Sequence, residues 1–188
     1  VFGHVVNTEP KDMYLSRVAA INGGCAEGTP AFNVNRLCGS GLQAIVSASQ
    51  SILLGDCDIA IGGGAENMSR APYASLSSRW GVRMGDTKMV DMMVGALHDP
   101  FHNIHMGVTA ENVAAKYGIT REMQDALALE SHNRAERATA EGRFKDQILP
   151  VMLKSKKGDV AYATDEHFRP GCKLEDMAKL KPVFVKEN

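Results

Sequence analysis

The chain has 188 residues, of which 44% are hydrophobic and 23% charged, a balance that argues against intrinsic disorder and favours a folded globular protein. Its 21 basic and 22 acidic side chains nearly cancel, so no broad positive field is available for nucleic acid or an anionic membrane. No apolar run approaches the roughly 20 residues of a membrane-spanning helix.

Strand and helix signals alternate in the first third of the chain. β-branched or alternating apolar runs predict strands, helical apolar spacing predicts helices, and glycines fall where the helices end. The predicted strand, helix, strand, helix and strand cover residues 1–6, 11–22, 31–35, 41–54 and 58–61. Strand, helix and strand in succession are typical of a parallel crossover, so the fold class is α/β.

The rest of the chain differs in composition and in hydrophobic periodicity. Residues 69–103 are rich in Met, Gly, Arg and Asp without a sustained period, which we interpret as an excursion from the core. Helices are predicted at 109–117 and 121–141, with Thr109 and Thr120 as N-caps. The charged, proline-punctuated remainder contains two short β-like runs, at 149–153 and 160–163.

Cys38 stands where a predicted strand ends and a predicted helix begins, with Gly39 and Gly41 directly after it. Backbone N–H groups and the helix dipole at such a point stabilise a thiolate, the reactive form of cysteine. The glycines leave room for a substrate carbonyl and permit unusual backbone angles, and the Cys38 N–H can donate to an oxyanion. We therefore expect Cys38 to be a nucleophile; the alternative is an inert buried thiol.

The other cysteines and the histidines carry weaker signals. Cys25, Cys57 and Cys172 lack a comparable setting, and none of the four cysteines forms a C-x-x-C pair or suffices for a disulfide framework. A reducing, cytoplasmic compartment fits best. The histidines near residue 100 have no second ligand group at zinc-site spacing, so no metal is expected.

The segment from Asn35 to Leu42, Asn-Arg-Leu-Cys-Gly-Ser-Gly-Leu, resembles the nucleophile motif of the thiolases, the acetyl-CoA acetyltransferases. Further thiolase-like segments follow in the family's order at residues 62–69, 84–86, 105–112 and 177–182. The resemblance covers essentially the whole chain and is strongest to bacterial β-ketothiolases that accept short acyl chains. It implies a partial, layered thiolase-like α/β core in residues 1–68 and an inserted loop domain in residues 69–188, which covers coenzyme A and makes subunit contacts.

The resemblance also implies roles for particular residues. Cys38 would be the nucleophile, and coenzyme A would be contacted by Leu97, His105, Met106 and Arg169. Asp176 stands where many members have serine, which puts that adenine-side contact in doubt. The alternatives are a hydrogen-bonded histidine at a helix start for His105 and a solvated surface charge for Arg169. Acyl-CoA and acetyl-CoA would be substrates rather than resident cofactors, and the protein would be a dimer or tetramer in fatty acid metabolism.

The family's Asn-Glu-Ala-Phe segment, Gly-His-Pro histidine and second catalytic cysteine are absent from this sequence. We therefore expect the isolated chain to be incomplete and inactive in the full reaction. Three rival readings stay open: a non-catalytic coenzyme A-binding or assembly fragment, a β-ketoacyl synthase relative, and a structural protein with an inert thiol. The triple glycine at 62–64 lacks a phosphate-binding spacing, so it predicts close backbone packing.

Overall fold

The computed structural model describes residues 1–185, which fall into two compact units that meet between Met106 and Gly107. The boundary that we expected between residues 68 and 69 separates a core from a domain inserted into it. A division by compactness does not test such a boundary, so it stays a prediction.

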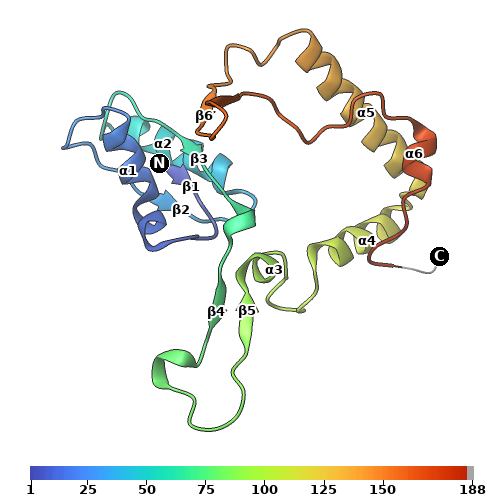
Figure 1. The fold of residues 1–188 in the computed structure, drawn as a ribbon, viewed down its shortest axis with the longest axis horizontal. Helices are drawn as coiled ribbons and strands as arrows, with labels where there is room; N and C mark the ends of the chain where they lie inside the picture. Colours follow the sequence, from blue (N-terminus) through green and yellow to red (C-terminus); the bar gives the residue numbers. More distant parts are fainter. Residues whose placement is uncertain (186–188) are drawn as a thin grey trace. The chain divides into compact units, whose positions relative to one another are not determined.

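A three-stranded parallel sheet lies at the centre of the first unit (Figure 1). The strand order is β2-β1-β3, and Phe2 on the central strand lies opposite Asn33 on one side and Gly63 on the other. The elements are β1 (Phe2–Gly3), a 3-10 helix (Pro10–Tyr14), α1 (Leu15–Asn22), β2 (Asn33–Val34), α2 (Ser40–Leu53) and β3 (Gly63–Gly64). Along the chain, α1 leads from β1 to β2 and α2 leads from β2 to β3. Helices thus alternate with parallel strands, which confirms the predicted α/β class.

The predicted strand at 58–61 is wrong, because the structure places β3 at Gly63–Gly64 instead. The hydrogen bonds to the central strand's segment begin at Ile61, whose carbonyl oxygen accepts the Val1 amino group at 2.7 Å, and the paired residues are Gly63 and Gly64. Ile59 and Ile61 are 85% and 62% exposed. Hydrophobicity therefore placed the strand too early, because the paired residues are set by hydrogen bonding to β1.

Helix α2 packs on the sheet through small residues. Ser40, Ala44 and Ala48, which recur every four residues, are its buried positions. A Cβ atom added to Gly62 would lie 2.9 Å from the Ile45 Cα, and one added to Gly3 would lie 2.6 Å from the Ser40 carbonyl carbon. Helix and strands therefore approach backbone to backbone, which confirms close packing for the triple glycine.

The first unit continues into a two-stranded antiparallel hairpin. It contains a 3-10 helix (Met68–Arg70), β4 (Tyr73–Ser75), a second 3-10 helix (Ser78–Trp80), β5 (Met89–Asp91) and α3 (Met92–Ala96). The Asp91 carboxylate caps α3 by accepting the N–H groups of Met93 and Val94 at 2.9 and 3.2 Å. The stretch read as an excursion thus has local order.

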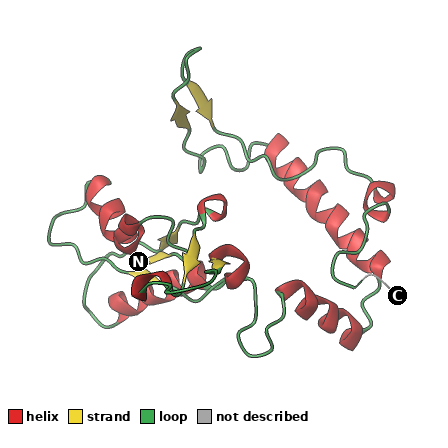
Figure 2. Cartoon of the chain, turned by 60° about the horizontal axis from the view of Figure 1, so that its bottom comes forward, coloured by secondary structure: helices red, strands yellow, loops and turns green. Residues whose placement is uncertain are grey.

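The second unit consists mainly of helices, which Figure 2 draws in red as it does those of the first unit. Its elements are α4 (Met106–Tyr117), α5 (Arg121–Ala140), β6 (Val151–Leu153), β7 (Val160–Tyr162) and α6 (Leu174–Ala178), with β6 and β7 antiparallel. Thr120 caps α5 as predicted, accepting the Met123 N–H at 3.3 Å. Thr109 is not an N-cap, because α4 begins three residues earlier.

The C-terminal segment of the second unit is tied to its helices. The Arg121 guanidinium donates to the carbonyl oxygens of Met177 and Leu180, each at 2.8 Å. The Phe184 ring lies so close to Gly107 that a Cβ at that position would overlap it. Across residues 1–185, no helix has the length and apolarity required to cross a membrane.

Candidate active site

Cys38 lies in the loop between β2 and α2, next to Gly39, the N-cap residue of the helix. Its side chain is exposed, so the thiol is not sealed in apolar packing. Gly39 has no side chain to cap the helix, and no side-chain hydrogen bond closes its first turn. The positive end of the α2 dipole therefore lies beside the sulfur without a competing side-chain acceptor.

The unusual backbone angle in this loop belongs to Leu37 rather than to a glycine. Leu37 has φ of +48°, in the left-handed region that residues with a Cβ resist. Gly39, by contrast, has φ of −87°. The expectation that the glycines would supply the special angles is thus wrong, because neither Gly39 nor Gly41 has a positive φ. Open space around Gly41 agrees with the expected room beside the sulfur.

Cys38 lines a largely apolar cavity of about 430 Å³. Its walls come from the ends of β1 and β3, the start of α2, and α3 with the residue that follows it. They consist of Gly3, Val5, Val6, Leu37, Cys38, Ser40, Gly41, Gly64, Ala65, Glu66, Met68, Ala71, Met93, Ala96 and Leu97. The structure thereby brings Cys38 together with Leu97, a predicted coenzyme A contact 59 positions later in the sequence.

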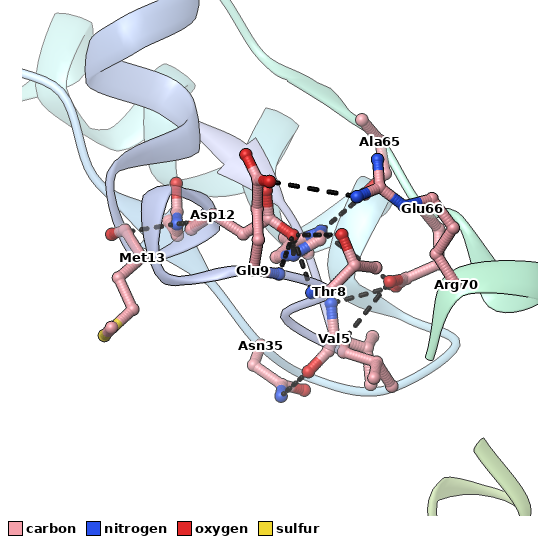
Figure 3. Close-up of polar contacts among 12 residues, drawn as sticks. Val5, Thr8, Glu9, Asp12, Met13, Asn35, Ala65, Glu66 and Arg70 are labelled. Carbon is pink, nitrogen blue, oxygen red and sulfur yellow. Dashed lines mark hydrogen bonds and ion pairs between the residues drawn. The ribbon is translucent and has the colours of Figure 1, made fainter. Parts of the chain in front are cut away.

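Glu66 lines one wall of the cavity together with Val5 and Val6. Its carboxylate accepts the backbone N–H groups of Val5 (Figure 3) and Val6 at 2.9 and 3.1 Å. Sequence reasoning missed this residue as a site element. Nothing in the local pattern marks it, because its partners lie about 60 positions away.

Below this wall, His4 is almost fully buried, and its Nδ1 donates to the Ala65 carbonyl oxygen at 2.8 Å. Its Nε2 has no hydrogen-bond partner among the described residues and lies 3.8 Å from an Asp12 carboxylate oxygen. Asp12 also accepts the Thr8 hydroxyl at 2.7 Å (Figure 3). That bond, followed by the backbone N–H of Thr8, lowers the pKa of Asp12.

His105 and Met106 lie beside Leu97 but do not line the cavity. The Met106 N–H donates to the Leu97 carbonyl oxygen at 2.9 Å, and the His105 ring meets the His98 ring edge to face, with centroids 5.3 Å apart. These two contacts connect the His-Met-Gly segment, which begins at His105, to Leu97 on the cavity wall and to the adjacent His98.

Arg169 lies in the second unit, where its backbone N–H donates to the His132 ring on α5 at 3.1 Å. The residue is exposed. Asp176 sits in the first turn of α6 and accepts the Lys173 N–H at 3.3 Å. The Asp176 carboxylate therefore takes part in capping the N-terminus of α6.

The remaining cysteines have no such setting. Cys25, Cys57 and Cys172 are half-buried free thiols, and none of them lines the Cys38 cavity. Within residues 1–185, no group of three or more potential ligands is placed to hold a metal ion.

Comparison with known proteins identifies relatives of this chain. The family model described as "Thiolase, N-terminal domain" matches residues 1–187. The β-ketothiolase BktB of Cupriavidus necator is 68% identical over 188 residues, covering 100% of this chain and 48% of that protein. An acetyl-CoA acetyltransferase of the same organism is 50% identical over 173 residues, covering 91% of this chain and 44% of that protein. The chain thus spans about half the length of these relatives.

Solved structures agree in fold. Human mitochondrial 3-ketoacyl-CoA thiolase superposes with a TM-score of 0.93 at 40% identity, covering 98% of this chain and 47% of that one. A structure of the human enzyme in complex with CoA gives a TM-score of 0.90 at 38% identity, over 98% of this chain and 46% of that one.

Proposed function

We propose that this chain, which belongs to the thiolase family through its N-terminal domain, carries the nucleophile of an acyltransferase that forms or cleaves short-chain 3-ketoacyl-CoA. The observation that carries the proposal is the position of Cys38: an exposed thiol, directly before an uncapped helix start, on the wall of a largely apolar cavity. The 68% identity to a β-ketothiolase supports the reaction class.

The chemistry follows from covalent catalysis. The Cys38 thiolate attacks the carbonyl carbon of an acyl-CoA, and the carbonyl oxygen takes up the electron pair. The carbon–sulfur bond to coenzyme A then breaks, coenzyme A leaves as a thiolate that takes a proton, and the acyl group stays on the Cys38 sulfur. The Cys38 N–H is a donor for the transient oxyanion. Acetyl-CoA, as a carbanion, accepts the acyl group in the synthetic direction, and coenzyme A accepts it in the thiolytic direction.

Coenzyme A contacts are part of the same proposal. Leu97 lies on the cavity wall and suits an apolar contact with the pantetheine chain. His105 and Met106 follow on the segment that is hydrogen-bonded to Leu97. The exposed Arg169 guanidinium is a suitable partner for a phosphate. The complex of a structural relative with CoA supports this ligand class.

The proposed setting of the whole protein follows from the relatives. We infer a cytoplasmic homo-oligomer, a dimer or tetramer, that acts in fatty acid metabolism on acyl-CoA and acetyl-CoA, without a resident cofactor. One support is a relative of 45% identity that is named as a cytosolic acetyl-CoA acetyltransferase of Mus musculus. Sedimentation of the protein at several concentrations tests the oligomeric state.

Acylation of the chain by acetyl-CoA tests the function. Intact-mass measurement after a rapid quench should show one acetyl group per chain, with release of an equal amount of coenzyme A. Cys38→Ser should remove both signals. Cys57→Ser is the matched control, since that half-buried cysteine lies away from the cavity.

Two results would contradict the proposal. A burst of released coenzyme A that persists in Cys38→Ser would assign the nucleophile elsewhere. Coenzyme A binding without any acylation of the unmodified chain would favour the non-catalytic binding or assembly fragment instead.

A further inference from the structure

The backbone of Leu37 is held in a conformation that its own side chain disfavours. Among the described residues, only Leu37 and Asn103 are non-glycine positions with positive φ, at +48° and +57°. Asparagine adopts this region readily, whereas leucine does not. Something outside Leu37 must therefore stabilise its conformation, and Leu37 directly precedes the proposed nucleophile.

Two side chains satisfy the polar groups of Leu37. The Leu37 N–H donates to Asn35 Oδ1 at 3.0 Å. The Leu37 carbonyl oxygen accepts the Ser40 hydroxyl at 2.6 Å and the Ser40 N–H at 2.9 Å. Ser40 Oγ also accepts the Arg36 N–H at 2.9 Å. Since Ser40 is only 5% exposed, water competes poorly for these bonds.

Asn35 reaches in a second direction, toward the cavity wall. Its Nδ2 donates to the Val5 carbonyl oxygen at 3.3 Å, while the Val5 N–H is held by Glu66. One amide thus accepts from the loop and donates to Val5, which a carboxylate cannot do because it has no donor. Asn35 therefore links the Cys38 loop to a second segment that lines the same cavity.

We propose that Asn35 and Ser40 are positioning residues: together they hold Leu37 in its left-handed conformation and thereby fix the direction of the Cys38 thiol within the cavity. The proposal rests on the proposed function, in which Cys38 accepts an acyl group. Neither side chain takes part in the chemistry. Both act through the backbone that precedes the sulfur.

The experiment compares Asn35→Ala, Asn35→Asp and Ser40→Ala with the unmodified chain. Ser49→Ala is the matched control, because the Ser49 hydroxyl donates to the Ile45 carbonyl oxygen within α2. Acylation by acetyl-CoA needs a fixed thiol, so it should slow by about tenfold to a hundredfold in the three variants. Alkylation by iodoacetamide, a small reagent without a binding site, should change by less than about threefold. Asn35→Asp keeps the bond to Leu37 and should be the mildest of the three.

A second pair of variants separates positioning from general stability. Leu37→Asn should partly restore acylation when added to Ser40→Ala, because asparagine favours the left-handed region. Leu37→Val, with a branched Cβ, should not restore it. NMR couplings that report φ at residue 37 should show a positive angle in the unmodified chain and its loss in Asn35→Ala and Ser40→Ala.

Three outcomes would overturn the proposal: acylation at the unmodified rate in the Asn35 and Ser40 variants, an equal loss of acylation and alkylation, or a positive φ at residue 37 that survives both alanine substitutions. Absence of acylation in the unmodified chain is a failure of the proposed function. In that case the NMR angle alone decides whether Asn35 and Ser40 hold Leu37.

Discussion

Two helix starts in this molecule are built in opposite ways. At α5, Thr120 accepts the Met123 N–H with its own hydroxyl. At α2, the N-cap is Gly39, which has no such oxygen, and the neighbouring residue is the exposed Cys38. A capped start stabilises the helix by itself, whereas an uncapped one leaves its positive end available to a thiolate or a bound anion. The difference teaches that the helix beside the proposed nucleophile starts without the side-chain cap that α5 has.

The largest expected effect comes from the packing beneath the uncapped start. Gly3→Ala places a methyl group 2.6 Å from the Ser40 carbonyl carbon, so the α2 start must shift. We expect a loss of about 1–3 kcal/mol in unfolding free energy, typical of overpacking. Denaturant titration measures it. Gly28→Ala is the matched control, because open space surrounds a Cβ at that position; equal stability in both variants would show that α2 does not depend on this contact.

Removing the cap of α5 should lower the unfolding free energy by less than Gly3→Ala does. Thr120→Ala removes the hydroxyl that accepts the Met123 N–H, and it should cost about 1 kcal/mol in the stability of the second unit. Hydrogen exchange of the first-turn amides of α5 measures this cost. Thr139→Ala near the other end of the same helix serves as control. Faster iodoacetamide reaction of Cys38 in Thr120→Ala would contradict the view that the two helix starts act separately.

Introducing a capping side chain at Gly39 tests the comparison between the starts of α2 and α5 directly. Gly39→Ser supplies a cap and should raise stability by only about a few tenths of a kcal/mol. Gly39→Asp supplies a cap and a negative charge, which should slow alkylation of Cys38 by about two- to fivefold near neutral pH because it opposes the thiolate. The serine variant controls for the side chain itself. If both variants reacted equally fast, the charge at this helix start would not matter.

The smallest effect concerns a third helix start, that of the 3-10 helix Pro10–Tyr14. Its N-cap residue is Glu9, and the Asp12 carboxylate in its first turn accepts the Glu9 N–H at 3.2 Å. Hydrogen bonds from Thr8 lower the pKa of Asp12 below its ordinary value of 3.8 in the folded state. A carboxyl group with a lowered folded-state pKa adds stability above its unfolded pKa, and this stability is lost as the pH falls through the folded value.

Thr8→Val removes the hydroxyl donor and should shift the acid-unfolding midpoint to higher pH, as followed by circular dichroism. Thr164→Val, outside the helices and strands, is the control. An unchanged midpoint in Thr8→Val would remove Asp12 from the account of acid stability.

The sequence predicted the elements whose signals are local. The α5 helix carries its own cap and a glycine with φ of +70° after its end, so both ends could be found. The position of Cys38 at a helix start could also be found, because strand, cysteine, glycine and helix are adjacent in the sequence.

Features that depend on distant partners could not be predicted in this way. The position of β3 is set by its register with β1 about 60 residues away. The cavity walls likewise come from separate elements, as Val5, Glu66 and Leu97 show. The left-handed angle at Leu37 is a different case, because its bonding partners Asn35 and Ser40 are close in sequence; it was missed because leucine itself carries no signal for this conformation.

The backbone-to-backbone contact between Gly3 and the first residues of α2 has a consequence for how this fold can change over time. A position that already holds the smallest residue can be altered only by adding atoms, so every mutation there acts in one direction, pushing the helix outward. The spacing between β1 and the start of α2, the helix that directly follows Cys38 and Gly39, therefore cannot be reduced by any substitution at Gly3.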